Sequence, residues 1–261
     1  MDSKNKVVTI PRIPQETIDG ILDHLSTDSD FKSLQSCALV SKSWIPSCRR
    51  RLFHTIIFTS THMLRWLETF PVLENSPAHF VRHLRLSIGE YGGAPEKFFE
   101  YIPWFTNVEK ATLLNYEDFG LLWIPPFWRL PQSVTSLTIG PYTHGGLMRV
   151  RDIMSQLPNL DDLSLSWSYP ERRDRALLGT GRVLRGRFSG KLELLRGCAG
   201  DPDVVDMLLE IPTGLHFTEV NIQNTHECLF SAVTLANVCA KTLVKFSYTV
   251  ELHCKEPFPL L

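Results

Sequence analysis

The spacing of hydrophobic positions changes once along the chain, close to residue 54. Before that point apolar residues recur every three or four positions, which places them on one face of an α-helix. The first such run is Ile18, Ile21, Leu22 and Leu25. Residues 31–40 and 44–53 show similar spacing. The pattern therefore predicts three short helices in the first fifty-odd residues.

Prolines and turn-forming residues mark the ends of these helices. Pro14 is expected in the first turn of the first helix, where a missing N–H loses no hydrogen bond. Ser43 is expected to cap the third helix, with Pro46 in its first turn. Three helices this short bury little apolar surface, so their apolar faces are predicted to continue onto a partner or the next domain.

From residue 55 onward, apolar and polar positions alternate in short patches, as they do in β-strands. The central apolar residue of each patch, here called its anchor, is Ile56, Leu84, Ala111, Leu137, Leu163, Leu192, Val220 or Phe246. Successive anchors are 28, 27, 26, 26, 29, 28 and 26 residues apart, which indicates a structural repeat. Helical spacing appears between patches, in residues 95–105, 145–157, 201–211 and 227–239. Repeated strand and helix units predict a parallel sheet with helices on its outer side.

Strand alternation also predicts what the other face of this sheet carries. The residue after each anchor points away from the core, and from the second strand to the last it is always polar. On a concave solenoid surface these residues are candidates for binding a target, and an ordinary hydrated sheet face is the alternative. They are Arg85, Thr112, Thr138, Ser164, Glu193, Asn221 and Ser247. The first strand has Ile57 at this place, which we expect the N-terminal helices to cover.

Two family resemblances follow from these residues. The sequence Ile13-Pro14-x-Glu16-x-Ile18-x-x-Ile21-Leu22-x-x-Leu25, followed by Leu34-x-x-Cys37-Ala38-Leu39-Val40-Ser41-Lys42-Ser43-Trp44, resembles an F-box over residues 10–54. It is most similar to the F-box-like proteins of mushroom-forming fungi. The repeat period and its Leu-x-x-Leu-x-Leu core resemble leucine-rich repeats over residues 55–261. The expected fold is α/β, with a three-helix F-box followed by a leucine-rich-repeat-like solenoid that has a curved parallel sheet and outer helices.

The F-box resemblance implies a non-catalytic function. F-boxes bind the Skp-type adaptor of a cullin-RING (SCF) ubiquitin ligase, so the chain is expected to be its substrate-recognition subunit, with the solenoid holding an unknown target protein. Each adaptor-facing residue could equally be core of the three-helix unit. Ile13 stands where the family usually has Leu, and Pro46 close behind Trp44 also departs from the pattern. The adaptor-facing residues implied are Pro14, Ile18, Ile21, Leu22, Leu25, Leu34, Leu39, Val40 and Trp44.

Composition and charge narrow the class of partner. The chain has 27 Lys and Arg against 28 Asp and Glu, a formal net charge of −1, which does not favour nucleic acid. No apolar run is long enough to cross a membrane. The six cysteines occur singly, so we expect them reduced and buried. These features predict an intracellular protein, cytoplasmic and/or nuclear, that binds neither nucleic acid nor membrane.

Catalytic and metal-binding motifs are missing from the sequence. It has no serine-hydrolase, P-loop or zincin motif, and two short His and Cys groups, residues 226–228 and 253–254, lack further ligands at metal spacing. We therefore expect no cofactor, no metal and no enzyme activity. Residues 179–186 faintly resemble a phosphate loop and are interpreted as a flexible insertion. The surrounding stretch, residues 171–196, has eight basic and three acidic residues and is interpreted as a solvated loop, with a patch for an acidic or phosphorylated partner as the alternative.

Two further readings stay open. The chain could be an interaction scaffold outside any ligase, in which the F-box helices only cap the solenoid. An enzyme is the third hypothesis. Residues 249–261 supply no polar capping helix. The last repeat is therefore expected to be exposed, or the chain to be a shortened form of a longer protein.

Overall fold

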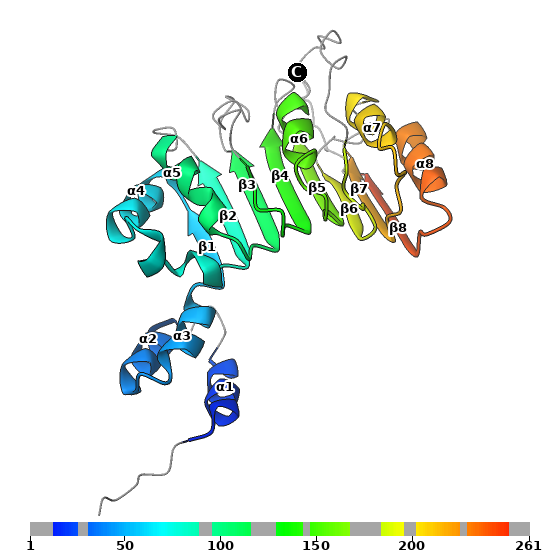
Figure 1. Ribbon diagram of the computed structural model, residues 1–261. Coiled ribbons are helices and arrows are strands. Elements are labelled where there is room, and N and C mark those ends of the chain that lie inside the picture. Colours follow the sequence, from blue (N-terminus) through cyan, green and yellow to red (C-terminus); the bar gives the residue numbers. More distant parts are fainter. Residues whose placement is uncertain are drawn as a thin grey trace, which may run out of the picture. The chain divides into compact units, whose positions relative to one another are not determined.

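The computed structural model describes residues 13–25, 31–88, 96–115, 129–142, 147–167, 184–195, 202–224 and 229–250. The chain divides into two compact units, Met1–His54 and Thr55–Leu261. The division falls where the hydrophobic spacing changes from helical to alternating. The first unit is helical and the second is built on a parallel sheet (Figure 1).

The first unit contains the three helices that the spacing predicts. They are α1 (Gln15–Asp23), α2 (Phe31–Val40) and α3 (Ile45–Leu52). Pro14 is the residue before α1 rather than part of its first turn, and Pro46 lies in the first turn of α3 as expected. The predicted Ser43 cap is wrong. The residue before α3 is Trp44, which forms no side-chain cap, whereas the Ser43 hydroxyl lies 3.0 Å from that of Ser41.

Polar contacts join α1 to α3 around a small core. The Arg51 guanidinium on α3 donates to the backbone oxygen of Asp19 at 3.0 Å and pairs with the Asp23 carboxylate. The Gln15 side-chain amide donates to the Ser47 hydroxyl at 2.9 Å. These contacts fix the first helix against the third. The buried core beneath them consists of Ile18, Leu22, Leu34 and Cys48.

The second unit is an all-parallel sheet whose eight described strands follow one another in sequence order (Figure 1). They are β1 (Thr55–Phe58), β2 (His83–Ile88), β3 (Lys110–Asn115), β4 (Ser136–Tyr142), β5 (Asp162–Trp167), β6 (Lys191–Leu195), β7 (Glu219–Asn224) and β8 (Lys245–Val250). Each strand contains one predicted patch or most of it. The sequential parallel order is compatible with a solenoid of strand and helix units.

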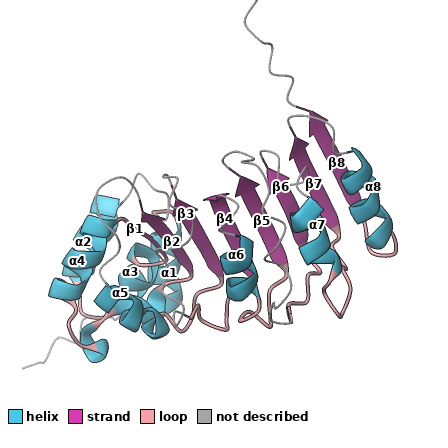
Figure 2. Ribbon diagram, turned by 90° about the horizontal axis from the view of Figure 1, so that it is seen from above, coloured by secondary structure: helices cyan, strands magenta, loops and turns pink. Residues whose placement is uncertain are grey.

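The helices of this unit lie on one face of the sheet (Figure 2). They are α4 (Ser60–Thr69), η2 (Leu73–Asn75), η3 (Pro77–Phe80), α5 (Glu96–Tyr101), η4 (Ile102–Trp104), α6 (Leu147–Met154), α7 (Pro202–Leu209) and α8 (Leu229–Val238). The four segments with helical spacing contain α5 to α8. Helix α4, in which Met63 and Trp66 are buried, lies outside the segments that were predicted to be helical.

The anchors form one row across the sheet. Each is the register partner of the next, beginning with Ile56 opposite Leu84 and ending with Val220 opposite Phe246. From β2 to β7 the anchor is at most 1% exposed, because it faces the helices. At the β1 end the core becomes aromatic: the Phe58 ring lies 5.2 Å from Trp66 and 4.8 Å from Phe98, centroid to centroid.

Side-chain hydrogen bonds also join consecutive repeats, in the turns that precede the strands. The Asn107 amide donates to the backbone oxygen of His79 at 2.7 Å, and the Asn159 amide donates to that of Gln132 at 3.0 Å. Each bond spans almost one repeat, 28 and 27 residues respectively. These bonds satisfy backbone carbonyls in the turns and hold successive repeats at a constant spacing.

Gly140 permits an irregularity between β4 and β5. The register shifts between Ile139 and Tyr142, and Gly140 has φ of +155°. A Cβ atom at this position would lie 2.5 Å from the Cβ atom of Ser166 on β5. Glycine is therefore required here because the neighbouring strand approaches its backbone too closely for any side chain.

Candidate binding surfaces

The residues implied to face an adaptor divide into core and surface. Ile18, Leu22 and Leu34 are buried inside the first unit and form its own core. Leu25 and Trp44 are half-buried against that core. These five side chains hold the three helices together, and at most two of them offer surface to a partner. The exposed remainder is Pro14, Ile21, Leu39 and Val40.

Large apolar side chains project from the first unit. Leu39 and Val40, in the last turn of α2, are 88% and 68% exposed, and Ile21 on α1 is 43% exposed. Two residues outside the implied adaptor set, Ile13 and Phe31, are also exposed. We call these five side chains the exposed apolar set.

The seven polar residues after the anchors also form one row. Arg85 is the register partner of Thr112, and the pairing continues strand by strand to Asn221 opposite Ser247. Because the anchors face the helices, this row lies on the opposite side of the sheet, here called the open face. Ser164 is buried, and the other six are exposed or half-buried. Their placement on one face is confirmed, and their role in recognition stays a prediction.

Both ends of the sheet carry exposed apolar residues. Ile57, the β1 member of the open-face row, is 49% exposed, and its covering by the N-terminal helices stays a prediction. At the other end the anchor Phe246 is 42% exposed, and the exposure of the last repeat as a whole stays a prediction. Phe230 on α8 is also exposed. Residues 251–261 lie outside the described part of the chain.

Glu193 is the centre of a polar network on the open face. Its carboxylate lies 2.6 Å from the ammonium nitrogen of Lys191 on the same strand. Burial alone would raise the pKa of Glu193, but the hydrogen bond and charge of Lys191, with hydrogen bonds from Ser164 and Asn221, hold that pKa below its ordinary value. The bond to Glu193 raises the pKa of Lys191. The network therefore favours the charged forms of both residues and links β5, β6 and β7.

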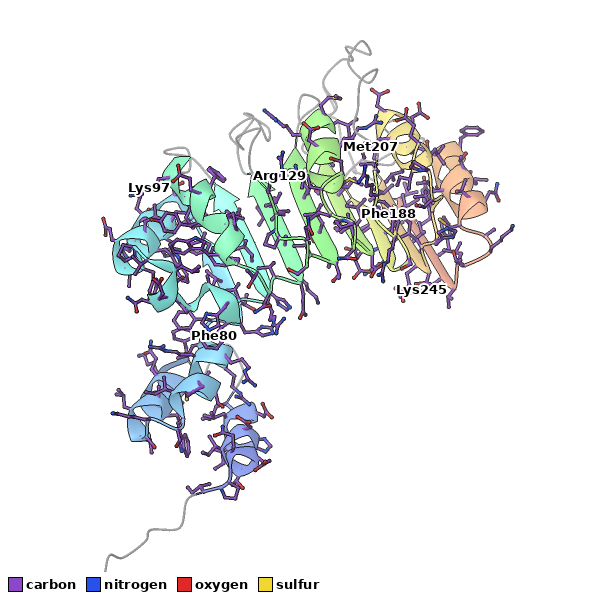
Figure 3. All side chains as sticks on the ribbon, viewed as in Figure 1. Phe80, Lys97, Arg129, Phe188, Met207 and Lys245 are labelled. Atoms are coloured by element: carbon purple, nitrogen blue, oxygen red, sulfur yellow. The ribbon has the colours of Figure 1, made fainter. Side chains whose placement is uncertain are left out.

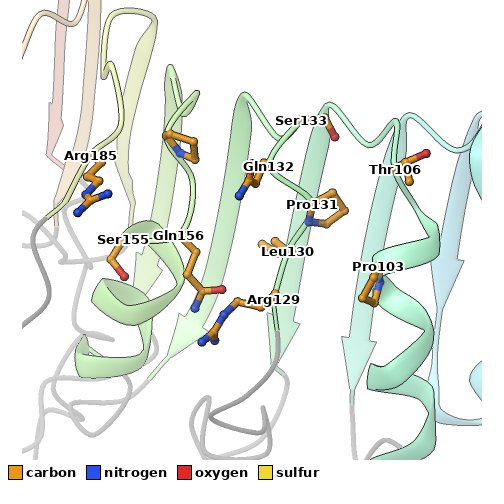
Figure 4. Close-up of a pocket in the computed structure, with 11 residues that line it drawn as sticks. Pro103, Thr106, Arg129, Leu130, Pro131, Gln132, Ser133, Ser155, Gln156 and Arg185 are labelled. Atoms are coloured by element: carbon orange, nitrogen blue, oxygen red, sulfur yellow. The ribbon is translucent and has the colours of Figure 1, made fainter.

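A pocket of about 580 Å³ lies beside η4, next to the segment that leads into β4 (Figure 4). Prolines form much of its wall, including Pro103, Pro131 and Pro158. Arg129 and Arg185 contribute guanidinium groups, and none of the described lining residues is Asp, Glu, His or Cys. None of the predicted binding residues lines it. The lining offers polar and apolar contacts and no acid–base pair.

The described residues contain no cluster of three or more His, Cys, Asp or Glu side chains placed to hold a metal ion. Residues 179–181, 226–228 and 253–254 and most of the basic stretch lie outside the described ranges. Three of the six cysteines are described. Cys37 is half-buried and Cys48 and Cys239 are buried, all as free thiols, and burial raises the pKa of the latter two.

Comparisons with known protein families, curated proteins and solved structures give no match to this chain. Among the described residues, every helix is too short or too polar to span a membrane.

Proposed function

We propose that the protein is the substrate-recognition subunit of an SCF-type ubiquitin ligase. The first unit is an F-box that binds a Skp-type adaptor, and through it a cullin scaffold. The second unit is a leucine-rich-repeat-like solenoid whose open face binds a target protein. The subunit performs no bond chemistry itself. It holds the target close to the ubiquitin-loaded enzyme, so its contribution is proximity and orientation.

The observation that carries this proposal is the exposure of Leu39 and Val40. The first unit already has a closed core of Ile18, Leu22 and Leu34, so these two side chains are not needed to hold its helices together. Exposure of adjacent aliphatic residues to water raises the free energy of the protein, and a partner that covers them lowers it. Both residues lie within the sequence that resembles an F-box.

A second candidate function is an interaction scaffold in which the helices only cap the sheet. The exposure of Ile57 on β1 and Leu64 on α4 favours this alternative, because an apolar sheet end is a surface that a cap would cover. The two functions differ in what the exposed apolar set contacts. An adaptor subunit contacts another protein, whereas a cap contacts its own chain.

Co-purification of the full chain with a Skp-type adaptor tests the proposal. The variant Leu39→Glu with Val40→Glu is expected to lose adaptor binding and to keep its melting temperature, because both side chains are exposed. The matched control is Ser33→Glu with Gln35→Glu, two exposed polar positions on the same helix, which is expected to bind normally. Equal binding by parent, variant and control would contradict the proposal. Substitution of Leu34 is a poor test, since it removes core packing.

The scaffold alternative makes the opposite prediction. If the helices only cap the sheet, the parent binds no adaptor, and Ile57→Asp lowers the melting temperature because Ile57 then lies in an interface within the chain. If the proposal holds, the parent binds the adaptor and Ile57→Asp leaves that binding unchanged. Pull-down and thermal melting of the same four proteins therefore separate the two functions.

A further inference from the structure

Charge is divided unevenly over the sheet. Strands β1 to β4 contain no Asp or Glu, whereas β5, β6 and β7 contain Asp162, Glu193 and Glu219. The cationic side chains of the first half are Arg85 and Lys110, with His83 beside them. One half of the open face is therefore basic, and the other half is mixed.

Strand register places these residues in a compact group. Lys110 on β3 is the partner of His83 on β2, and Arg85, two residues along β2, is the partner of Thr112. All four point to the open face, because the anchors Leu84 and Ala111 between them point to the helices. Neighbouring strands lie about 4.8 Å apart and alternate residues about 6.6 Å apart. We call His83, Arg85, Lys110 and Thr112 the basic patch.

The two long cations of the patch are available to a ligand. Arg85 and Lys110 are exposed, and neither forms an ion pair with a described residue. Lysines farther along the same face differ, because Lys191 pairs with Glu193 at 2.6 Å and Lys245 lies 3.9 Å from Glu219. The charge of Lys191 is largely neutralised within the fold, whereas Arg85 and Lys110 have no ion-pair partner in the part of the chain that the structure describes.

We propose that the basic patch binds an acidic, extended segment of the target protein, with carboxylates on alternate residues. This inference rests on the proposed function, in which the open face holds the target. Alternate side chains of an extended peptide project to the same side, about 6.6 Å apart. The same distance separates the register pair of His83 and Lys110 from the pair of Arg85 and Thr112, which lies two residues farther along the strands. The Arg85 guanidinium presents two parallel donors to one carboxylate, and Lys110 pairs with the other.

The spacing distinguishes this ligand from a single phosphate group. Lys110 and Arg85 lie diagonally across the patch, about 8 Å apart at their Cα atoms from the strand and residue spacings. Two separate carboxylates can each pair with one cation, so that the Lys110 and Arg85 side chains stay extended over their own register pairs. A lone phosphate contacts both cations only when the two side chains converge on it, whereas two carboxylates leave each side chain over its own pair of residues.

Fluorescence anisotropy of the full chain at low salt tests the proposal. The probe is a fluorescein-labelled peptide, Gly-Ser-Glu-Gly-Glu-Gly-Glu-Ser-Gly, and a second probe carries one phosphoserine in place of its three glutamates. Arg85→Glu with Lys110→Glu is expected to weaken binding of the first probe at least about tenfold. The matched control is Lys97→Glu with Lys241→Glu, which makes the same change in net charge at two exposed lysines outside the strands; Lys97 is labelled in Figure 3. The control is expected to stay within about twofold of the parent.

Three results would overturn the inference. They are no saturable binding of the glutamate probe by the parent, equal weakening by the two double variants, and stronger binding of the single-phosphoserine probe. The patch variant is expected to bind the Skp-type adaptor as the parent does, since its changes lie in the second unit. If the parent does not bind the Skp-type adaptor, the proposed function is contradicted instead. The two failures are therefore distinguishable.

Discussion

Glu193 and Lys191 lie two residues apart on β6 and form an ion pair on the open face, with 2.6 Å between carboxylate oxygen and ammonium nitrogen. Glu193 also receives hydrogen bonds from Ser164 on β5 and Asn221 on β7. The pair thus lies at the middle of a network across three strands. Each of these two charged residues therefore has its partner on the same strand. Arg85 and Lys110 of the basic patch, on β2 and β3, have no such partner among the described residues.

The ion pair is expected to make stability depend on pH. The pKa of Glu193 is lowered from 4.5, so its contribution is present above about pH 4.5 and is lost as the pH falls through the lowered pKa. The pKa of Lys191 is raised from 10.5, so its contribution is present below about pH 10.5 and is lost as the pH rises through the raised pKa. Urea unfolding of the parent and Glu193→Gln at pH 3, 7 and 11 measures this. We expect the two proteins to differ most at pH 7, and a difference independent of pH would contradict the assignment.

Gly140→Ala is expected to destabilise the second unit by about 1–3 kcal/mol, because the added methyl group would lie 2.5 Å from the Cβ atom of Ser166. Gly20→Ala is the control, since nothing lies within 4 Å of a Cβ atom there and the position is inside α1. Alanine at position 20 is expected to stabilise the helix by about 0.5–1 kcal/mol. Chemical denaturation of both variants checks the signs, and equal effects would show that Gly140 is not constrained.

The strands and their register could be predicted from the sequence because the same pattern of apolar and polar residues recurs in every repeat. A single apolar and polar alternation is ambiguous, but anchors separated by 26 to 29 residues fix which residues pair across the sheet. Leu163 opposite Leu192 and Ser164 opposite Glu193 follow from that period alone. The first helix of the second unit, α4, was not predicted, although it buries Met63 and Trp66 three residues apart.

Which apolar residues of the first unit are exposed could not be predicted from the sequence. Ile18, Ile21 and Leu22 all lie on one broad apolar face, and the helical spacing does not reveal which part of that face the other helices cover. The structure buries Ile18 and Leu22 and exposes Ile21. The helix cap was also missed, because Ser43 bonds with Ser41 instead of the start of α3, a choice that depends on the local backbone path.

Asn159→Ala is expected to destabilise the protein by about 1 kcal/mol, because it removes the hydrogen bond to the Gln132 carbonyl of the preceding repeat. Asn107→Ala is expected to have a similar cost, since its amide makes the equivalent bond to His79. Asn237→Ala, at an exposed position in α8, is the control and is expected to be neutral or slightly stabilising. Urea unfolding measures all three, and a larger cost at Asn237 than at Asn159 would contradict the role of these side chains.

Two anchors in the same row are expected to respond differently to truncation. Leu192 on β6 is fully buried, so Leu192→Ala removes apolar contacts and leaves a cavity, at a cost of about 2–5 kcal/mol. Phe246 on β8 is 42% exposed, so Phe246→Ala loses less buried area despite its larger side chain, and we expect a cost of about 1 kcal/mol. Urea unfolding of the isolated full chain measures both. A cost at Phe246 as large as at Leu192 would show that another part of the protein or a second copy covers the last strand in solution.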